Sequence, residues 1–135
     1  GVWIEVESEG LFCYDLEKEK LQNFTLKNFP FISTNVQSFV FDNSGTLWIG
    51  CYGDGLFYSK DRLKTLQPYI SPVDNKETFE NDVVTTLVKG AYNCLYIGSL
   101  RGGAKELNLT SNKLMKMKNR FFVVTCWLLL IMNYG

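Results

Sequence analysis

The sequence predicts an all-β fold, an incomplete β-propeller of about three four-stranded antiparallel blades. Three observations predict it. A segment centred on Trp48 recurs around Trp3 and Tyr96, at offsets of 45 and 48 residues, a period typical of propeller blades. Short apolar runs alternate with turns rich in Asp, Asn and Gly, as expected of short strands. No segment shows the sustained periodicity of a helix.

The clearest repeat joins "TLWIGCYGDGLFYS" at 46–59 to "CLYIGSLRGGAKEL" at 94–107, and "VWIEVESEGLFCYD" at 2–15 is the remaining copy. Seven recurring positions are assigned a structural role: Trp3, Trp48, Tyr96, Gly50, Gly98, Gly55 and Gly103. We expect the aromatic residues to fill the space between blades, and Gly50 and Gly98 to lie where backbones crowd. Glu5 departs from the pattern because it takes the place of this glycine in the first copy.

The repeat divides the chain into four parts. Residues 1–30 form a partial blade with strands two to four, 31–70 and 71–119 form complete blades, and 120–135 begin a further blade or form an aberrant end. The expected strands are 2–7, 10–15, 20–27, 36–41, 46–52, 56–60, 64–70, 83–89, 94–100, 104–109 and 113–119. Pro68 places the strand at 64–70 on a sheet edge. The polar segment 71–82 is expected to be a loop.

Composition narrows the class of protein. The chain carries 14 basic and 14 acidic residues, and their interspersed arrangement argues against a nucleic-acid surface, which needs a concentrated basic patch. The longest apolar run, 121–132, is shorter than the roughly 20 residues that span a bilayer, so a buried strand is favoured.

The chain opens within a predicted strand and lacks an initiator Met, which indicates a fragment of a longer protein.

The residues with reactive side chains do not form a catalytic or metal-binding pattern. The chain has no His, so a Ser–His or Cys–His pair is excluded, and no metal or cofactor is expected. Cys13, Cys51, Cys94 and Cys126 are well separated, and buried free thiols are favoured over a disulfide. Glu9, Asp42 and Asp54 are interpreted as turn residues rather than as paired carboxylates of a glycosidase.

The middle copy resembles the two-component regulator propeller repeat. The residues that fill the repeat in order are Val36, Phe39, Asp42, Gly45, Leu47, Trp48, Ile49, Gly50, Gly55 and Leu56, with Cys51 in place of the usual Thr. The first copy keeps the ending "GLFCYD". The third copy has Gly90 where the acid belongs and Asn93 where the turn glycine belongs.

This resemblance implies a function. The family builds propellers in the periplasmic sensor region of hybrid two-component histidine kinases, common in gut Bacteroidetes, which detect glycan fragments and switch on polysaccharide-utilisation genes. The chain is therefore expected to be a periplasmic, non-catalytic sensing segment, whose parent protein carries the kinase. A propeller segment of a secreted glycan-degrading enzyme and a pure interaction scaffold remain the alternatives.

The candidate ligand residues lie in the loops between the second and third strands of each predicted blade. Tyr52, Asp54, Leu100 and Arg101 lie there, and Tyr52, Asp54 and Arg101 are candidate ligand residues, because an aromatic ring suits a sugar face while Asp and Arg bind hydroxyls or carboxylates. The alternative is that they are ordinary solvated loop residues. The complete propeller would bind an oligosaccharide and contact the rest of the parent propeller and kinase. The isolated chain is expected to self-associate, since three blades cannot close a ring.

Overall fold

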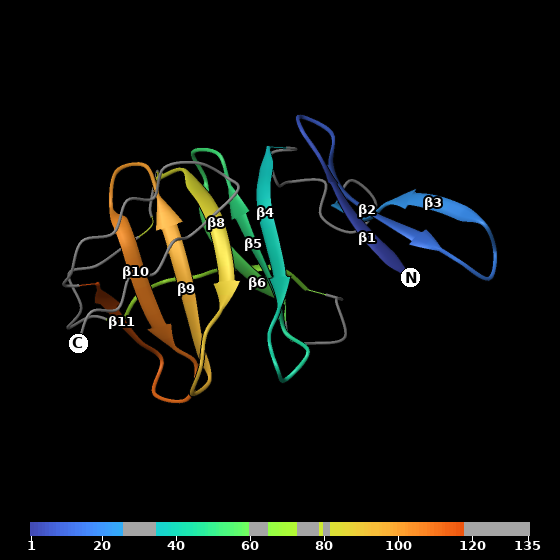
Figure 1. Ribbon diagram of the computed structural model, residues 1–135. Helices are drawn as coiled ribbons and strands as arrows, with labels where there is room; N and C mark the ends of the chain where they lie inside the picture. Colours follow the sequence, from blue (N-terminus) through green and yellow to red (C-terminus); the bar gives the residue numbers. More distant parts are fainter. Residues whose placement is uncertain (26–34, 60–64, 73–78, 80–81, 118–135) are drawn as a thin grey trace.

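The computed structural model describes residues 1–25, 35–59, 65–72, 79 and 82–117. These residues form eleven β-strands in three antiparallel sheets, and the predicted all-β fold is confirmed (Figure 1). The first sheet has three strands in the order β1 (Val2–Val6), β2 (Gly10–Asp15) and β3 (Lys20–Asn23). Within the described residues this sheet has no fourth strand.

The other two sheets have four strands each, and every strand pairs with the next one in sequence. The second sheet comprises β4 (Val36–Phe41), β5 (Leu47–Cys51), β6 (Gly55–Ser59) and β7 (Gln67–Pro68). The third comprises β8 (Val84–Lys89), β9 (Cys94–Ser99), β10 (Gly103–Asn108) and β11 (Lys113–Lys116). β7 is shorter than the expected strand at 64–70, and its Pro68 lies at the sheet edge, where a missing N–H is tolerated. The expected part at 120–135 lies outside the described residues.

The opening strands of the two complete sheets carry the same irregularity. In β4 the register with β5 shifts between Val36 and Ser38, and in β8 the register with β9 shifts between Val84 and Thr86. Each shift is a β-bulge, which bends a strand and increases its twist. The two copies, 48 residues apart, therefore share this backbone bulge as well as their sequence pattern.

Alternating side chains of the second sheet face its two neighbours. Leu47 and Ile49 of β5 lie in an apolar cluster with Trp3 and Leu11 of the first sheet. Trp48, between them in sequence, lies in a second cluster with Leu95 of the third sheet and its neighbours. Because strand side chains alternate between faces, β5 is buried on both sides and the second sheet is the centre of the stack.

Two glycines of the repeat lie where chains approach closely. A Cβ atom on Gly50 would come within 2.5 Å of Cγ1 of Val84 on the neighbouring sheet, so the close packing of β5 against β8 requires its absence. Gly55 has a φ of 80°, and a Cβ atom there would collide with the carbonyl oxygen of Phe79. Gly103 has a φ of 69° at the equivalent position of the third sheet.

The cysteines differ from the prediction at one position. Cys51 and Cys94 are buried free thiols, but Cys13 is only partly buried. Cys13 lies on β2 in one row with Trp3 and Gln22, and Gln22 on the edge strand β3 is exposed, so this part of the row is covered less. Cys126 lies outside the described residues. Across the described part of the chain, no helical segment has the length and apolar character needed to span a bilayer.

Candidate functional site

The acidic residue of the repeat, Asp42, holds the turn between β4 and β5 together. Its Oδ1 accepts hydrogen bonds from the backbone N–H groups of Ser44 and Thr46, both at 2.9 Å, and from the Ser44 hydroxyl at 2.7 Å. Its Oδ2 accepts a hydrogen bond from Nε1 of Trp48 at 2.9 Å. Burial alone would raise the pKa of Asp42, but the hydrogen bonds from Trp48, Ser44 and Thr46 outweigh it and lower the pKa. The carboxylate is thus used to hold the turn and orient the indole.

The third sheet shows how the repeat accommodates the loss of this acid. Gly90 takes the place of Asp42, and the ring of Tyr96 lies where a side chain on residue 90 would be. Tyrosine has no indole N–H at this position that needs an acceptor, so the carboxylate is not required. Desolvation, with the nearby charges of Glu106 and Cys94, raises the pKa of Tyr96.

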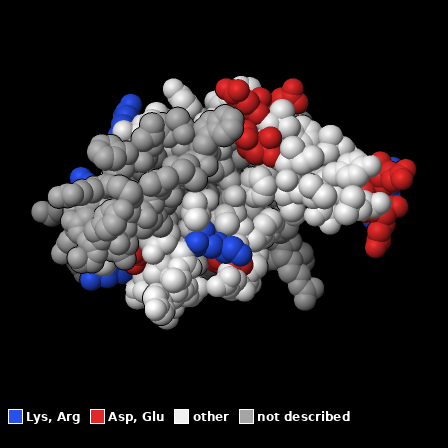
Figure 2. Space-filling view, viewed as in Figure 1, with Lys and Arg blue, Asp and Glu red and all other residues white. Residues whose placement is uncertain are grey.

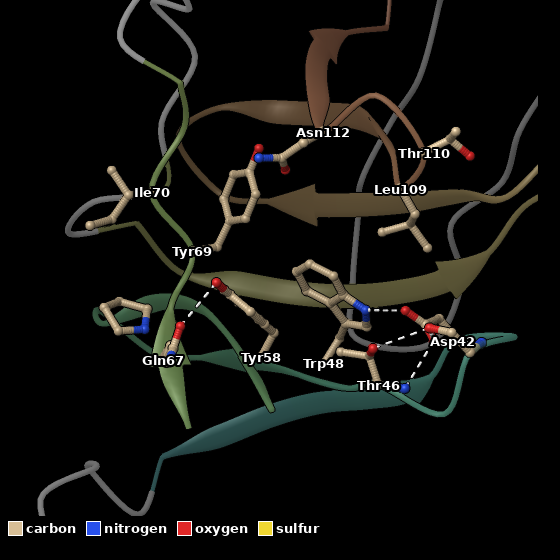
Figure 3. Close-up of a pocket in the computed structure, with 12 residues that line it drawn as sticks. Asp42, Thr46, Trp48, Tyr58, Gln67, Tyr69, Ile70, Leu109, Thr110 and Asn112 are labelled. Carbon is tan, nitrogen blue, oxygen red and sulfur yellow. Dashed lines mark hydrogen bonds between the residues drawn. The ribbon is translucent and has the colours of Figure 1, made fainter. Parts of the chain in front are cut away.

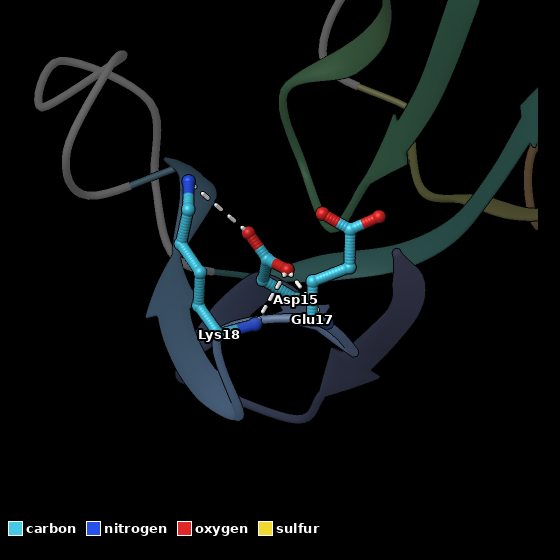
Figure 4. A network of polar contacts seen from close by, with 3 residues as sticks. All are labelled: Asp15, Glu17 and Lys18. Atoms are coloured by element: carbon cyan, nitrogen blue, oxygen red, sulfur yellow. Dashed lines mark hydrogen bonds and ion pairs between the residues drawn. The ribbon is translucent and has the colours of Figure 1, made fainter.

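A similar turn closes the first sheet. Oδ1 of Asp15 accepts hydrogen bonds from the backbone N–H groups of Glu17 and Lys18, at 3.0 and 3.1 Å, and Oδ2 lies 3.4 Å from Nζ of Lys18 (Figure 4). The bond from the Lys18 N–H is the main cause of a lowered pKa of Asp15. Asn108 plays the same part in the third sheet, accepting the N–H groups of Thr110 and Ser111. These polar residues are structural turn residues.

The predicted ligand residues lie on two neighbouring turns. Tyr52 and Asp54 are in the turn between β5 and β6, and Arg101 is in the turn between β9 and β10. The Tyr52 side chain is 56% exposed, and that of Leu100 beside Arg101 is 60% exposed. No hydrogen bond joins the side chains of Tyr52 or Asp54 to Arg101. The turns therefore present separate exposed groups on adjacent sheets.

Asp82, which sequence analysis placed in a loop, connects these two turns. Its side chain is only 4% exposed. The carboxylate accepts the backbone N–H groups of Arg101 and Gly102, both at 3.1 Å, and that of Val83 at 2.7 Å. Its main-chain oxygen accepts the N–H of Gly55 at 3.2 Å. Asp82 therefore fixes the turn that carries Arg101 relative to the turn that carries Asp54.

A buried cation lies beneath the same region. Lys105 of β10 is 3% exposed, and its Nζ lies 4.5 Å from the ring centroid of Phe79, which is itself 2% exposed. An ammonium over an aromatic face is attracted by the ring quadrupole. Phe79 and Asp82 lie between the second and third sheets in sequence, and these two residues pack under the turns and support them.

A groove lies at the opposite end of the same two sheets. It has a volume of about 580 Å³ and is lined by residues that include Trp48, Tyr58, Gln67, Tyr69 and Asn112 (Figure 3). The Tyr58 hydroxyl donates to Oε1 of Gln67 at 3.1 Å. We call this feature the interblade groove. Sequence analysis missed it because its lining residues come from turns and strands far apart in the chain.

The polar groups of the interblade groove are mostly uncharged. Asp42 is the charged residue among those that line it, and its oxygens already accept four hydrogen bonds. The Tyr69 hydroxyl is buried beside that of Ser71, and neither has a partner at bonding geometry among the described residues. Burial is the main cause of a raised pKa of Tyr69. Aromatic faces with neutral donors and acceptors suit an uncharged polar ligand.

The acidic and thiol side chains of the two ends are scattered. Within the described residues, no group of three or more His, Cys, Asp and Glu side chains is placed to hold a metal ion.

Comparisons with known proteins agree with the fold. Residues 30–53 match the family model described as "Two component regulator propeller". Solved structures with the same fold include the extracellular domains of two B. thetaiotaomicron proteins named as hybrid two component systems. The domain of BT4673 has a TM-score of 0.66 at 19% identity over 84% of this chain, and that of BT3049 has 0.66 at 20% over 86%. This chain spans only 15% and 16% of their lengths. No curated protein matches the chain.

Proposed function

We propose that this chain is a non-catalytic part of the extracytoplasmic, ligand-sensing propeller of a hybrid two-component sensor histidine kinase, located in the periplasm and responsive to glycans. The observation that carries the proposal is the family match over 30–53, which covers β4, the Asp42 turn and β5. The propeller fold shared with extracellular domains of such systems supports it.

The ligand in this proposal is an oligosaccharide bound at the turns that carry Tyr52, Asp54 and Arg101. An exposed tyrosine ring offers an apolar face, while a carboxylate and a guanidinium offer an acceptor and several donors for sugar hydroxyls. The link through Asp82 supports this assignment because it holds the two turns in a fixed relation, and a preorganised site binds with less loss of conformational entropy.

The test is transcription in cells that carry the intact gene, grown on a panel of polysaccharides. Deleting the gene is expected to abolish induction by one polysaccharide, and Tyr52→Ala and Arg101→Ala are expected to weaken it. Tyr92→Ala is the matched control, since this tyrosine is 95% exposed in the turn between β8 and β9. Unchanged induction after deletion would refute the proposed function.

The same experiment locates the ligand. Gln67→Ala changes the interblade groove and leaves the two turns intact. A response that is lost in Gln67→Ala but kept in Tyr52→Ala would assign the ligand to the groove, and would contradict the assignment to the turns while leaving the sensing function in place.

A further inference from the structure

The floor of the interblade groove is one row of side chains of the second sheet. Trp48, Tyr58 and Gln67 are paired directly across β5, β6 and β7, so they lie on one face, and Trp48 packs there against the third sheet. The opposite wall is the turn between β10 and β11, which contributes Thr110 and Asn112. Both walls come from complete four-stranded sheets, so the groove is an internal feature of this part of the propeller.

Three aromatic rings of the groove hold one another in place. The ring centroid of Trp48 lies 5.2 Å from that of Tyr58 and 6.1 Å from that of Tyr69. The indole is further held by its hydrogen bond to Asp42, and the Tyr58 hydroxyl by its bond to Gln67 (Figure 3). A ligand that packs on these rings meets a surface that is already ordered, so binding costs less conformational entropy.

The groove also contains neutral polar groups that lack a partner. The Tyr69 side chain is 9% exposed, and its hydroxyl is buried with no hydrogen-bond partner among the described residues, although buried polar groups in proteins are nearly always paired. Figure 3 shows the Tyr69 ring directed toward the turn that carries Asn112. The amide nitrogens of Gln67 and Asn112 make no hydrogen bond to the described part of the chain. A molecule with several hydroxyl groups can bond to all three side chains.

Charge is nearly absent from the groove. Asp42 is the charged residue among the described residues that line it, and its oxygens already accept four hydrogen bonds. Figure 2 shows acidic side chains gathered over the first sheet, on the right of the view, whereas the groove belongs to the other two sheets. A charged ligand would find no counter-ion in the groove, so its lost hydration would not be compensated.

We propose that the interblade groove is a second saccharide site, which binds a short segment of an uncharged oligosaccharide. The sugar ring packs on the aromatic rings, and its hydroxyls bond to Tyr69, Gln67 and Asn112. The volume of about 580 Å³ lies within the range of about 300–1,000 Å³ typical of small-molecule sites. The choice of a saccharide rests on the proposed function, whereas the place of the site and its preference for a neutral ligand rest on the groove itself.

An NMR titration of the ¹⁵N-labelled 135-residue chain tests this site. The probes are neutral trisaccharides of glucose, of mannose and of galactose, and trigalacturonate is the charged comparison. At least one neutral trisaccharide is expected to shift the side-chain amide signals of Gln67 and Asn112 and the indole signal of Trp48. The amide signal of Gln22, on β3 of the first sheet, should stay in place. Trigalacturonate is expected to shift none of these signals.

Three variants identify the groups that bind. Tyr69→Phe keeps the ring and removes the unpartnered hydroxyl, so it should weaken binding roughly two- to tenfold without lowering stability. Asn112→Gly removes an amide at a backbone φ of 55°, which glycine adopts without strain, and should also weaken binding. Glu19→Gly is the matched control, since Glu19 has a φ of 51° in the turn between β2 and β3, and its affinity should equal that of wild type.

The possible results separate this proposal from the proposed function. The groove is not a neutral saccharide site if no neutral trisaccharide shifts its signals, if trigalacturonate shifts them equally, or if Tyr69→Phe and Asn112→Gly bind like wild type. Shifts confined to the backbone amides of Tyr52 and Arg101 would likewise overturn the groove while supporting the turns. Shifts in the groove, combined with unchanged induction after deletion of the gene, would support the groove and refute the sensing function.

Discussion

The indole Nε1 of Trp48 donates a 2.9 Å hydrogen bond to Oδ2 of Asp42, six residues earlier in the chain. This bond explains the spacing of the repeat motif. Oδ1 of Asp42 accepts the hydrogen bonds that close the turn, and Gly45 has a φ of 83° within that turn. Trp48 follows on β5, which places its indole beside the carboxylate. The motif therefore encodes both the turn and the direction of the ring that packs between sheets.

Replacing Trp48 is expected to cost far more stability than replacing Tyr52. The Trp48 side chain is 5% exposed and that of Tyr52 is 56% exposed. Trp48→Ala should lower the free energy of unfolding by about 3–5 kcal/mol, whereas Tyr52→Ala should change it by about 0.5 kcal/mol or less. Urea unfolding of the two variants measures both values, and equal shifts of the midpoint would show that Trp48 is not a packing residue.

The carboxylate of Asp42 should make stability depend on pH. Its pKa is lowered in the folded chain, so its contribution is complete above the ordinary aspartate pKa and is lost as the pH falls through the lowered value. Asp42→Asn should be less stable than wild type by about 1 kcal/mol at neutral pH. The difference in unfolding free energy between wild type and Asp42→Asn should shrink as the pH falls through the lowered pKa of Asp42. A difference that stays constant from neutral pH into acid would contradict a stabilising role of the ionised carboxylate.

Removing the Asp82 carboxylate should loosen one turn. Asp82→Ala leaves the N–H groups of Val83 and Arg101 without their acceptor, whereas that of Gly102 keeps the Ser99 hydroxyl, and an unsatisfied buried donor costs about 1–3 kcal/mol. Hydrogen exchange at these two amides should accelerate. Asp15→Ala is the control, because Asp15 also accepts two backbone N–H groups but in an exposed turn. Unchanged exchange at Arg101 in Asp82→Ala would show that the carboxylate does not hold the turn.

The cysteines should differ in reactivity. Burial, with a smaller effect of the charge on Asp54, raises the pKa of Cys51 to about 12, and the side chain is 0% exposed. Because the thiolate is the reacting species, Cys51 should resist iodoacetamide at neutral pH until the chain unfolds. Cys13 is partly exposed and should be labelled before Cys51. Mass spectrometry of the labelled peptides gives the order, and labelling of Cys51 as fast as Cys13 would contradict it.

The strands could be predicted because each carries its own local signal. Val36 and Val84 align across the repeat, and both begin opening strands with the same bulge. Pro68 predicted an edge strand, and it lies on one. The ends of the fourth strands were predicted less accurately. These are edge strands, and each pairs with only one neighbour, so the length of the strand depends on the hydrogen bonds to that neighbour alone.

Other features depend on contacts that no local pattern contains. The segment 71–82 is polar and was predicted as a loop, yet Phe79 is among the most buried residues and Asp82 joins two sheets. A single aromatic in a polar segment was the available signal. The interblade groove likewise joins Gln67 to Asn112, and the sequence alone does not bring these residues together.

The packing of unlike faces has an evolutionary consequence. The second sheet packs one face on the first sheet and the row of Val40, Trp48 and Tyr58 on the third, so a duplicated 48-residue unit would arrive with both complementary surfaces already in place. When a gene gains one more such unit, the added sheet makes the same kind of contact with its neighbours as the existing sheets do, so selection has no new interface to improve. Divergence can then concentrate on exposed turns such as those of Tyr52 and Arg101, while the register of the array is inherited unchanged.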